Sequence, residues 1–271
     1  MFSPETRALR VLGVALVTIS AYWTGDYISN FLRKFRGASD ERLARRIHYA
    51  AVDFWMHLVL VANGYWLVSQ NSYVLEALAP SRIWTRSLLP PEVAYYYTAQ
   101  LCVYCGGLVL ALLDRATPDR ARMLAHHVVT LFLVGYSLAH GMWPVGLALM
   151  LACDPSDVLL HAGKLAKDAF ENEVVATLFF ASFIALWAYQ RLYGIVALII
   201  APYVASHFWG AAAATEPWYV AETSLGVALA LAALAALFAA WTYEIGRSVW
   251  RKLRYGELED VREAAAKAHG E

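Results

Sequence analysis

The residues of this chain that are equipped for chemistry are ionisable side chains set within long apolar stretches. Two adjacent histidines, His126 and His127, stand at the head of the run HHVVTLFL, and Thr130 follows one helical turn later. Inside a membrane such groups are costly, and by default they face the interior of a helix bundle. A neutral imidazole can attack an activated carbonyl, bind a metal or carry a proton, so the pair indicates a functional site.

A second set of polar residues follows in the next apolar stretch. Asp154, Asp157, His161 and Lys164 are three, four and three residues apart, which places them on one face of a helix. Lipid would not tolerate four such side chains on one face, so this stripe is expected to face protein or water. A carboxylate beside an imidazole sets the tautomer of the ring and balances the charge that develops on attack.

Ionisable groups occur at two further places in apolar stretches. Asp53 and His57 are four residues apart and therefore share a helix face, and Arg191 lies in a later stretch. A metal site is the main alternative chemistry, because histidine and aspartate supply nitrogen and oxygen ligands. Adjacent histidines, however, point about 100° apart on a helix and are poor joint ligands for one ion. We therefore expect no metal.

The elements that must position these residues are membrane helices. Of the 271 residues 60% are hydrophobic and only 16% are charged, whereas a soluble domain would carry about a quarter charged residues. The apolar residues fall into blocks about twenty residues long, the length that crosses a bilayer. We predict an all-α integral membrane protein with about seven transmembrane helices. The expected spans are 11–31, 47–69, 93–113, 123–142, 144–163, 174–199 and 223–248.

Two details of these spans can be tested against a structure. The sixth is broad enough to break near Pro202, and the tyrosines at 95–97 are interpreted as part of an aromatic belt at the membrane surface. The turn GMWPVG should make the fourth and fifth spans antiparallel neighbours. Counted from that turn, His126 is level with His161 and Thr130 with Asp157, so the two polar clusters are expected to converge.

The distribution of positive charge predicts the orientation of the chain. Strict alternation of seven spans places 17 of the 22 Lys and Arg residues in loops and a tail on one side. The positive-inside rule makes that side cytosolic, with the N-terminus on the other side and the C-terminus in the cytosol. No basic stripe exists outside the loops, so nucleic acid is not an expected partner.

The same residues carry a resemblance to a known family. The pattern runs from an Asp seven residues before the histidine pair, through HH-x-x-T and a later Ser, to D-x-S-D and a Lys. It is matched by Asp119, His126, His127, Thr130, Ser137, Asp154, Ser156, Asp157 and Lys164. This pattern resembles that of the TLC-domain family, in its ceramide synthase branch. Weaker similarity extends over residues 33 to 250, from KFRGAS at 34–39 to Trp241 and Arg247.

The resemblance implies a domain plan. Residues 1–32 would form an N-terminal anchor helix, 33–250 a TLC-type catalytic domain and 251–271 a polar cytosolic tail. Six of the helices would form a barrel around a lipid chamber. The protein would be a multi-pass membrane protein, of the endoplasmic reticulum if the source is eukaryotic.

It also implies a reaction, the transfer of a fatty acyl group from acyl-CoA to the amine of a sphingoid base to give ceramide or dihydroceramide. Acyl-CoA would be the co-substrate and no other cofactor is expected. Partners would be acyl-CoA, the sphingoid base and membrane lipids, with a homodimer as a further candidate. The expected catalytic residues are His126, His127, Asp154 and Asp157, and the expected supporting residues are His161, Lys164, Thr130, Arg191, Asp53 and His57.

Within that reaction we expect His126 to attack the thioester and form an acyl-imidazole, with Asp157 or Asp154 orienting the ring. His127 or His161 would take the proton of the incoming ammonium. Arg191, Arg120 and Arg122 are candidates to contact CoA phosphates. For the last two, ordinary cytosolic charge is the favoured interpretation.

The chain departs from the family pattern at three places. Cys153 stands where members usually have His, His161 where they have Glu, and Pro144-Val145-Gly146 replaces an Arg-x-Gly. The departures leave open a non-catalytic member of the family that binds or senses lipids. A proton-coupled transporter is a weaker alternative, because no internal repeat is visible.

Overall fold

The structure is a computed structural model that describes residues 20, 22–37, 40–80, 82–113, 119–213, 220 and 222–256. Its regular elements are helices, and no strand occurs within those ranges. They are a helix at 22–36, α2 (Glu41–Gln70), α3 (Ser72–Ala77), α4 (Pro91–Leu113), α5 (Arg120–Ala139), α6 (Trp143–Asp168), α7 (Glu173–Trp187), the π-helix η1 (Ala188–Ile200), α8 (Ala201–Ala213) and α9 (Leu225–Tyr255).

The expected membrane spans coincide with helices in this structure. Within the described ranges six helices are long and apolar enough to cross a bilayer: Glu41–Gln70, Pro91–Leu113, Arg120–Ala139, Trp143–Asp168, Glu173–Gly210 and Leu225–Tyr255. These confirm the all-helical membrane fold. Residues 11–19 and 21 of the expected first span, and residues 257–271 of the expected tail, lie outside the described residues.

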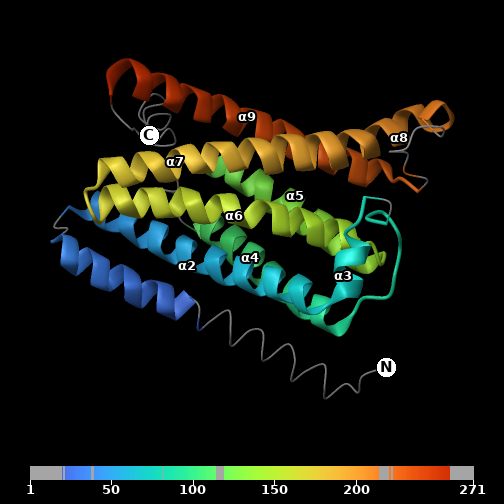
Figure 1. The fold of residues 1–271 in the computed structure, drawn as a ribbon, viewed down its shortest axis with the longest axis horizontal. Coiled ribbons are helices and arrows are strands. Elements are labelled where there is room, and N and C mark those ends of the chain that lie inside the picture. Colours follow the sequence, from blue (N-terminus) through green and yellow to red (C-terminus); the bar gives the residue numbers. More distant parts are fainter. Residues whose placement is uncertain are drawn as a thin grey trace. The chain divides into compact units, whose positions relative to one another are not determined.

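The described chain divides into two compact units. The first contains the residues up to Val103 and Ser137–Gln190, and the second contains Tyr104–Tyr136 and the residues from Arg191 onward. In the first unit α6 packs against both α2 and α7, so that the three long helices lie side by side (Figure 1). A core of Leu32, Ile47, Ala50, Ala51, Leu165 and Ala169 joins the 22–36 helix to α2 and α6. The expected barrel of six helices stays a prediction.

Contacts at the helix ends of the first unit agree with alternating spans. Arg36 forms an ion pair with Glu171, and Arg46 Nη2 lies 2.6 Å from Asp168 Oδ1. These pairs bring the loop before α2 and the loop after α6 to the same end of the unit. At the opposite end the amide of Ser87 donates to the carbonyl of Gly141 at 2.9 Å.

The second unit contains α8 and α9, which pack against each other. The hydroxyl of Tyr203 accepts a hydrogen bond from the amide of Ser224 at 2.8 Å. Arg120, in the first turn of α5, donates to the carbonyls of Ala111 (2.7 Å) and Leu112 (2.9 Å) near the end of α4. Its guanidinium therefore satisfies acceptors that a helix end leaves unpaired.

The expected break near Pro202 is wrong. The chain stays helical through that residue, because η1 directly precedes it. Proline has no amide hydrogen, and its ring clashes with the carbonyl four residues earlier in an α-helix. The wider turns of a π-helix are one way in which a helix accommodates such a clash. The change of direction comes instead at Gly210, where φ is 28° and ψ is −101°.

Candidate active site

The D-x-S-D stretch lies in the middle of α6, and Pro155 is part of the helix between its two aspartates. Proline removes one amide from the helix ladder. The hydroxyl of Ser156 donates to the carbonyl of Cys153 at 2.9 Å, a bond to the backbone of the preceding turn of the same helix. The motif thus combines two carboxylates with a locally weakened backbone ladder.

Asp154 is almost fully buried, at 3% exposure, and α4 supplies its partners. Gln100 Nε2 donates to Asp154 Oδ2 at 2.6 Å and also to the hydroxyl of Tyr96 at 2.9 Å. The Tyr96 hydroxyl donates to the same carboxylate oxygen at 3.4 Å. A buried carboxylate needs such donors, because its desolvation is otherwise uncompensated.

Sequence reasoning missed Tyr96 and Gln100. Their spacing of four residues in an apolar helix was the available signal, since it places both on one face. The interpretation of residues 95–97 as an interfacial belt is wrong for two of the three tyrosines: Tyr96 is 5% exposed and Tyr97 is fully buried. The Tyr97 hydroxyl donates to the carbonyl of Trp143 at 2.9 Å and lies 3.2 Å from the Ser137 hydroxyl.

The two ionisable residues on α2 meet the polar stripe of α6. His57 Nε2 lies 3.8 Å from Asp157 Oδ2, and His161 Nε2 lies 3.7 Å from Asp53 Oδ2. The two imidazole rings stack with 5.7 Å between centroids and an angle of 19° between planes. We call Asp53, His57, Asp157 and His161 the quartet. Lys164 lies one turn further along α6 and is half-buried.

The histidine pair lies in α5, in the second unit. The ring of His127 rests on the backbone of Gly107 in α4, so closely that a methyl group there would come within 2.9 Å of its Nε2. His127 Nδ1 is buried and has no hydrogen-bond partner among the described residues. His126 Nδ1 lies 3.5 Å from the hydroxyl of Thr130, at the limit of a hydrogen bond.

His126 is also held by α9. The ring of Trp241 meets it edge to face, with 5.3 Å between centroids and an angle of 76°. The indole Nε1 donates to Asp119 Oδ2 at 3.1 Å. The other oxygen of Asp119 lies 2.6 Å from Arg122 Nε. A chain of contacts therefore runs from the start of α5 through α9 back to His126.

The arginines proposed for CoA have partners within the protein. Arg191 is 4% exposed, and its guanidinium lies over the ring of Phe238 at 5.4 Å from the centroid. Arg120 binds the end of α4, and Arg122 pairs with Asp119. Whether Arg120 and Arg122 contact CoA or are ordinary cytosolic charge stays open. A contact between Arg191 and CoA stays a prediction.

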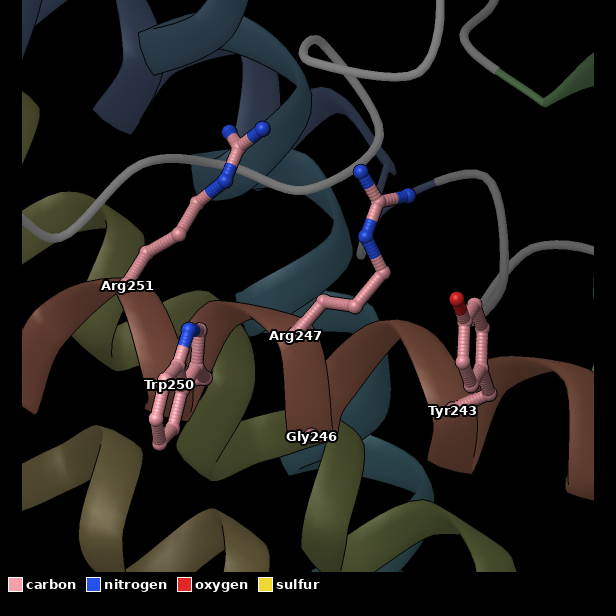
Figure 2. Close-up of a pocket in the computed structure, with 5 residues that line it drawn as sticks. All are labelled: Tyr243, Gly246, Arg247, Trp250 and Arg251. Carbon is pink, nitrogen blue, oxygen red and sulfur yellow. The ribbon is translucent and has the colours of Figure 1, made fainter.

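A hollow of about 330 Å³ opens on the last turns of α9, lined by Tyr243, Gly246, Arg247, Trp250 and Arg251. Figure 2 shows the Arg247 and Arg251 side chains extending to the same side of the helix, one turn apart. Arg247 also lies 3.2 Å from Glu244 and over the ring of Tyr243. The sequence analysis placed these residues at the end of the last expected span and the start of the tail, and did not identify them as a binding site.

Polar or aromatic neighbours thus lie beside the four expected catalytic residues and beside five of the supporting ones, Asp53, His57, Thr130, His161 and Arg191. The histidine pair and the D-x-S-D carboxylates belong to different units, so their convergence stays a prediction. The described residues contain no set of three or more His, Cys, Asp or Glu side chains arranged to hold a metal ion. The metal and cofactor expectations also stay predictions.

Comparison with known proteins gives concordant matches. A family model of the TLC domain matches residues 40–247. The chain is 27% identical to ceramide synthase hyl-2 of Caenorhabditis elegans over 84% of its length and 70% of the relative. It is 26% identical to ceramide synthase hyl-1 of the same organism over 80% of its length and 58% of the relative. It is 31% identical to ceramide synthase LOH2 of Arabidopsis thaliana over 56% of its length and 49% of the relative.

Proposed function

The chain belongs to the TLC-domain family, and from this premise we propose that it transfers a fatty acyl group from acyl-CoA to the amine of a sphingoid base. The product is ceramide or dihydroceramide. The observation that carries the proposal is that the imidazole pair and the two carboxylates of the motif are all present, with Asp154 held by buried donors. The names of the relatives, ceramide synthases in nematode and plant, support it.

The proposed first step is attack by His126 on the thioester carbonyl. A bond forms between an imidazole nitrogen and the acyl carbon, the carbon–sulfur bond breaks, and CoA leaves as the thiolate. Asp157 or Asp154 balances the charge on the imidazole. The contact with Trp241 fixes the plane of the His126 ring, which limits the orientations from which it can attack.

In the proposed second step the amine attacks the acyl-imidazole. A sphingoid base reaches the membrane as an ammonium ion, so a base must remove a proton before its nitrogen can act as a nucleophile. His127 or His161 is proposed for this role. A dry, apolar surrounding protects the acyl intermediate from water, and each CH₂ of the chain buried there contributes about 0.8 kcal/mol.

Acyl-CoA is proposed to approach from the cytosolic side, where the C-terminus of α9 would lie; the membrane would be that of the endoplasmic reticulum in a eukaryote. Arg247 and Arg251 offer two guanidinium groups to CoA phosphates. Trp250 in the same hollow offers a face for the adenine ring. We propose this hollow as the phosphate site in addition to Arg191.

Intact mass spectrometry tests the proposal. The purified protein receives palmitoyl-CoA, then sphinganine, beside His126→Ala and His127→Ala. The expected result is a mass gain of one acyl group that one of the two variants lacks and that discharges as ceramide. Ceramide without an adduct would keep the transferase and remove the acyl-histidine step. No adduct and no ceramide with acyl chains of several lengths would overturn the proposal in favour of lipid binding.

A further inference from the structure

The quartet pairs its members across two helices in a regular geometry, whereas the acyl-transfer scheme above uses only Asp157 and His161, and each of them singly. Antiparallel packing of α2 and α6 pairs Asp53 with His161 and, one turn further, His57 with Asp157. The same register continues to Arg46 and Asp168. Each imidazole thus faces a carboxylate of the other helix. This arrangement depends on the histidine at 161: a Glu there, as in the family pattern, would face Asp53 with a like charge.

The hydrogen bond at the other nitrogen of His57 determines where a proton can be added. Nδ1 of His57 lies 2.7 Å from the carbonyl oxygen of Asp53. A carbonyl can only accept, so Nδ1 carries the hydrogen and donates it. In the neutral ring the lone pair is then on Nε2, which points toward Asp157. The ring is therefore oriented to accept a proton at Nε2, next to a carboxylate that stabilises the resulting cation.

The stacking of the two rings limits the charge that the quartet can hold. With 5.7 Å between the His57 and His161 centroids, two imidazolium ions would repel each other in a poorly solvated site. The pair is therefore suited to hold one proton at a time. Exposure of the side chains increases from His161, at 11%, through His57, at 22%, to Asp53, at 48%. Asp53 thus has the most exposed side chain of the four residues.

We propose that the quartet accepts one proton per turnover from the sphingoid ammonium and releases it on the side of Asp53. This rests on the proposed acyl transfer. His57 here takes the role given above to His127 or His161: an N–H bond of the ammonium breaks as an N–H bond forms at His57 Nε2. The lone pair freed on the amine nitrogen then forms the bond to the acyl carbon, and the bond between that carbon and the imidazole nitrogen of His126 breaks, which restores the free histidine. The second amine proton neutralises the thiolate of CoA. Thioester and ammonium thus give amide, thiol and one proton, which is the proton that the quartet carries away.

Other ionisable groups near the quartet must be considered in any pH experiment. Asp154 lies on α6 beside Asp157 and is bonded to Tyr96 and Gln100 of α4. On α7, the other neighbour of α6, the one ionisable side chain is Glu173, in the first turn. The pH profile of amide formation therefore has to be compared with that of a variant in which only a member of the quartet is changed.

The test separates the two chemical steps. Acyl loading from palmitoyl-CoA and amide formation with sphinganine are each measured across about pH 5 to 8, where imidazole titrates. His57→Gln is expected to lower kcat of amide formation about a hundredfold, with loading and KM for palmitoyl-CoA unchanged. It should also remove the fall in rate toward low pH, which arises in the wild type when His57 is already protonated.

His48→Gln is the matched control. His48 also lies on α2 and has a carboxylate neighbour, Asp26 Oδ1 at 3.5 Å from Nδ1, but it is outside the quartet. Its rates and pH profile should remain those of the wild type. The reciprocal exchange Asp53→His with His161→Asp keeps one imidazole and one carboxylate in contact, so it should recover amide formation that each single change loses.

The outcomes distinguish the two proposals. Wild-type protein that forms no amide overturns both. Amide formation by the wild type together with an unaltered pH profile in His57→Gln overturns the proton transfer alone. In that case a lower melting temperature would identify the quartet as a tie between helices. The reciprocal exchange gives a further criterion. If the protein carrying both Asp53→His and His161→Asp still loads acyl groups but forms amide no faster than the single variants, the proposal is contradicted.

Discussion

At the scale of single residues, the two histidines of α5 are held in different ways. His127 lies against a bare stretch of backbone at Gly107, whereas His126 is held by the edge of Trp241 and by Thr130. A side chain added at position 107 would move the first ring, and a change at position 241 would move the second. The two contacts can therefore be disturbed separately.

Gly107→Ala tests the first contact. The new methyl group would lie within 2.9 Å of His127 Nε2, so the ring has to move. A displacement of about 1 Å at a reacting group can cost a hundredfold in rate, and we expect a loss of that order in ceramide formation. Gly106→Ala is the control, because nothing lies within 4 Å of its added methyl. Equal activities of the two variants would contradict the importance of the contact.

Trp241→Phe tests the second contact. Phenylalanine keeps an aromatic edge for His126 but loses the hydrogen bond to Asp119, a bond that contributes about 1 kcal/mol. We expect acyl loading to slow roughly fivefold to tenfold, in proportion to that free energy. Trp241→Ala, which removes the edge as well, should slow it further. Rates measured by rapid quench would refute this account if both variants load acyl groups as fast as wild type.

At the scale of helices, the approach of α2 to α6 and α4 depends on Gly64. A methyl group there would overlap Leu151 of α6 and would lie 2.9 Å from the Tyr96 hydroxyl of α4. That hydroxyl is one of the donors to Asp154. One absent side chain thus permits both the close helix contact and the hydrogen bonding of the buried carboxylate.

Gly64→Ala is expected to destabilise the protein by about 1–3 kcal/mol, the usual cost of overpacking. Thermal unfolding in detergent measures the effect. Gly135→Ala, also in a membrane helix but with nothing within 4 Å of the added methyl, should raise stability by up to about 1 kcal/mol through helix propensity. A melting temperature of Gly64→Ala equal to that of wild type would show that α2 and α6 can separate without cost.

Helix–helix register was the part of the site that the sequence could not predict. The four members of the quartet were all expected to be functional, because charge inside a span is costly wherever it lies. That Asp53 pairs with His161, more than a hundred residues later, depends on packing between helices, which periodicity within one helix does not specify. Tyr96 and Gln100 were missed for a related reason. Neither side chain is charged, so the sequence alone gave no sign that their polar groups are buried in the protein and need hydrogen-bond partners there.

At the scale of the whole molecule, the described residues contain six helices, from α2 onward, that are long and apolar enough to span a membrane. Their positions could be predicted from the sequence because the length of an apolar block is a local property. An even number of spans returns the chain to the side from which it started. Residues 34 and 256 are therefore expected on one side of the membrane, and residue 88, in the loop after α3, on the other.

Cysteine labelling tests this orientation. In a chain with Cys102, Cys105 and Cys153 changed to Ala, single cysteines replace Lys34, Leu88 or Gly256. A membrane-impermeant maleimide applied to sealed vesicles should label Lys34→Cys and Gly256→Cys from the same face and Leu88→Cys, at a position 96% exposed, only from the other. Labelling of Gly256→Cys together with Leu88→Cys would require an odd number of spans between residues 34 and 256.

The bonds from Arg120 to the end of α4 bear on how the protein is made. They join residues only eight and nine positions apart, and closing so short a loop costs little entropy. The hairpin of α4 and α5 can therefore form while α6 is still on the ribosome, so the histidines would be in place before the aspartates are synthesised. Nascent chains halted beyond Ala139 should already resist extraction from the membrane, and Arg120→Gln should weaken that resistance.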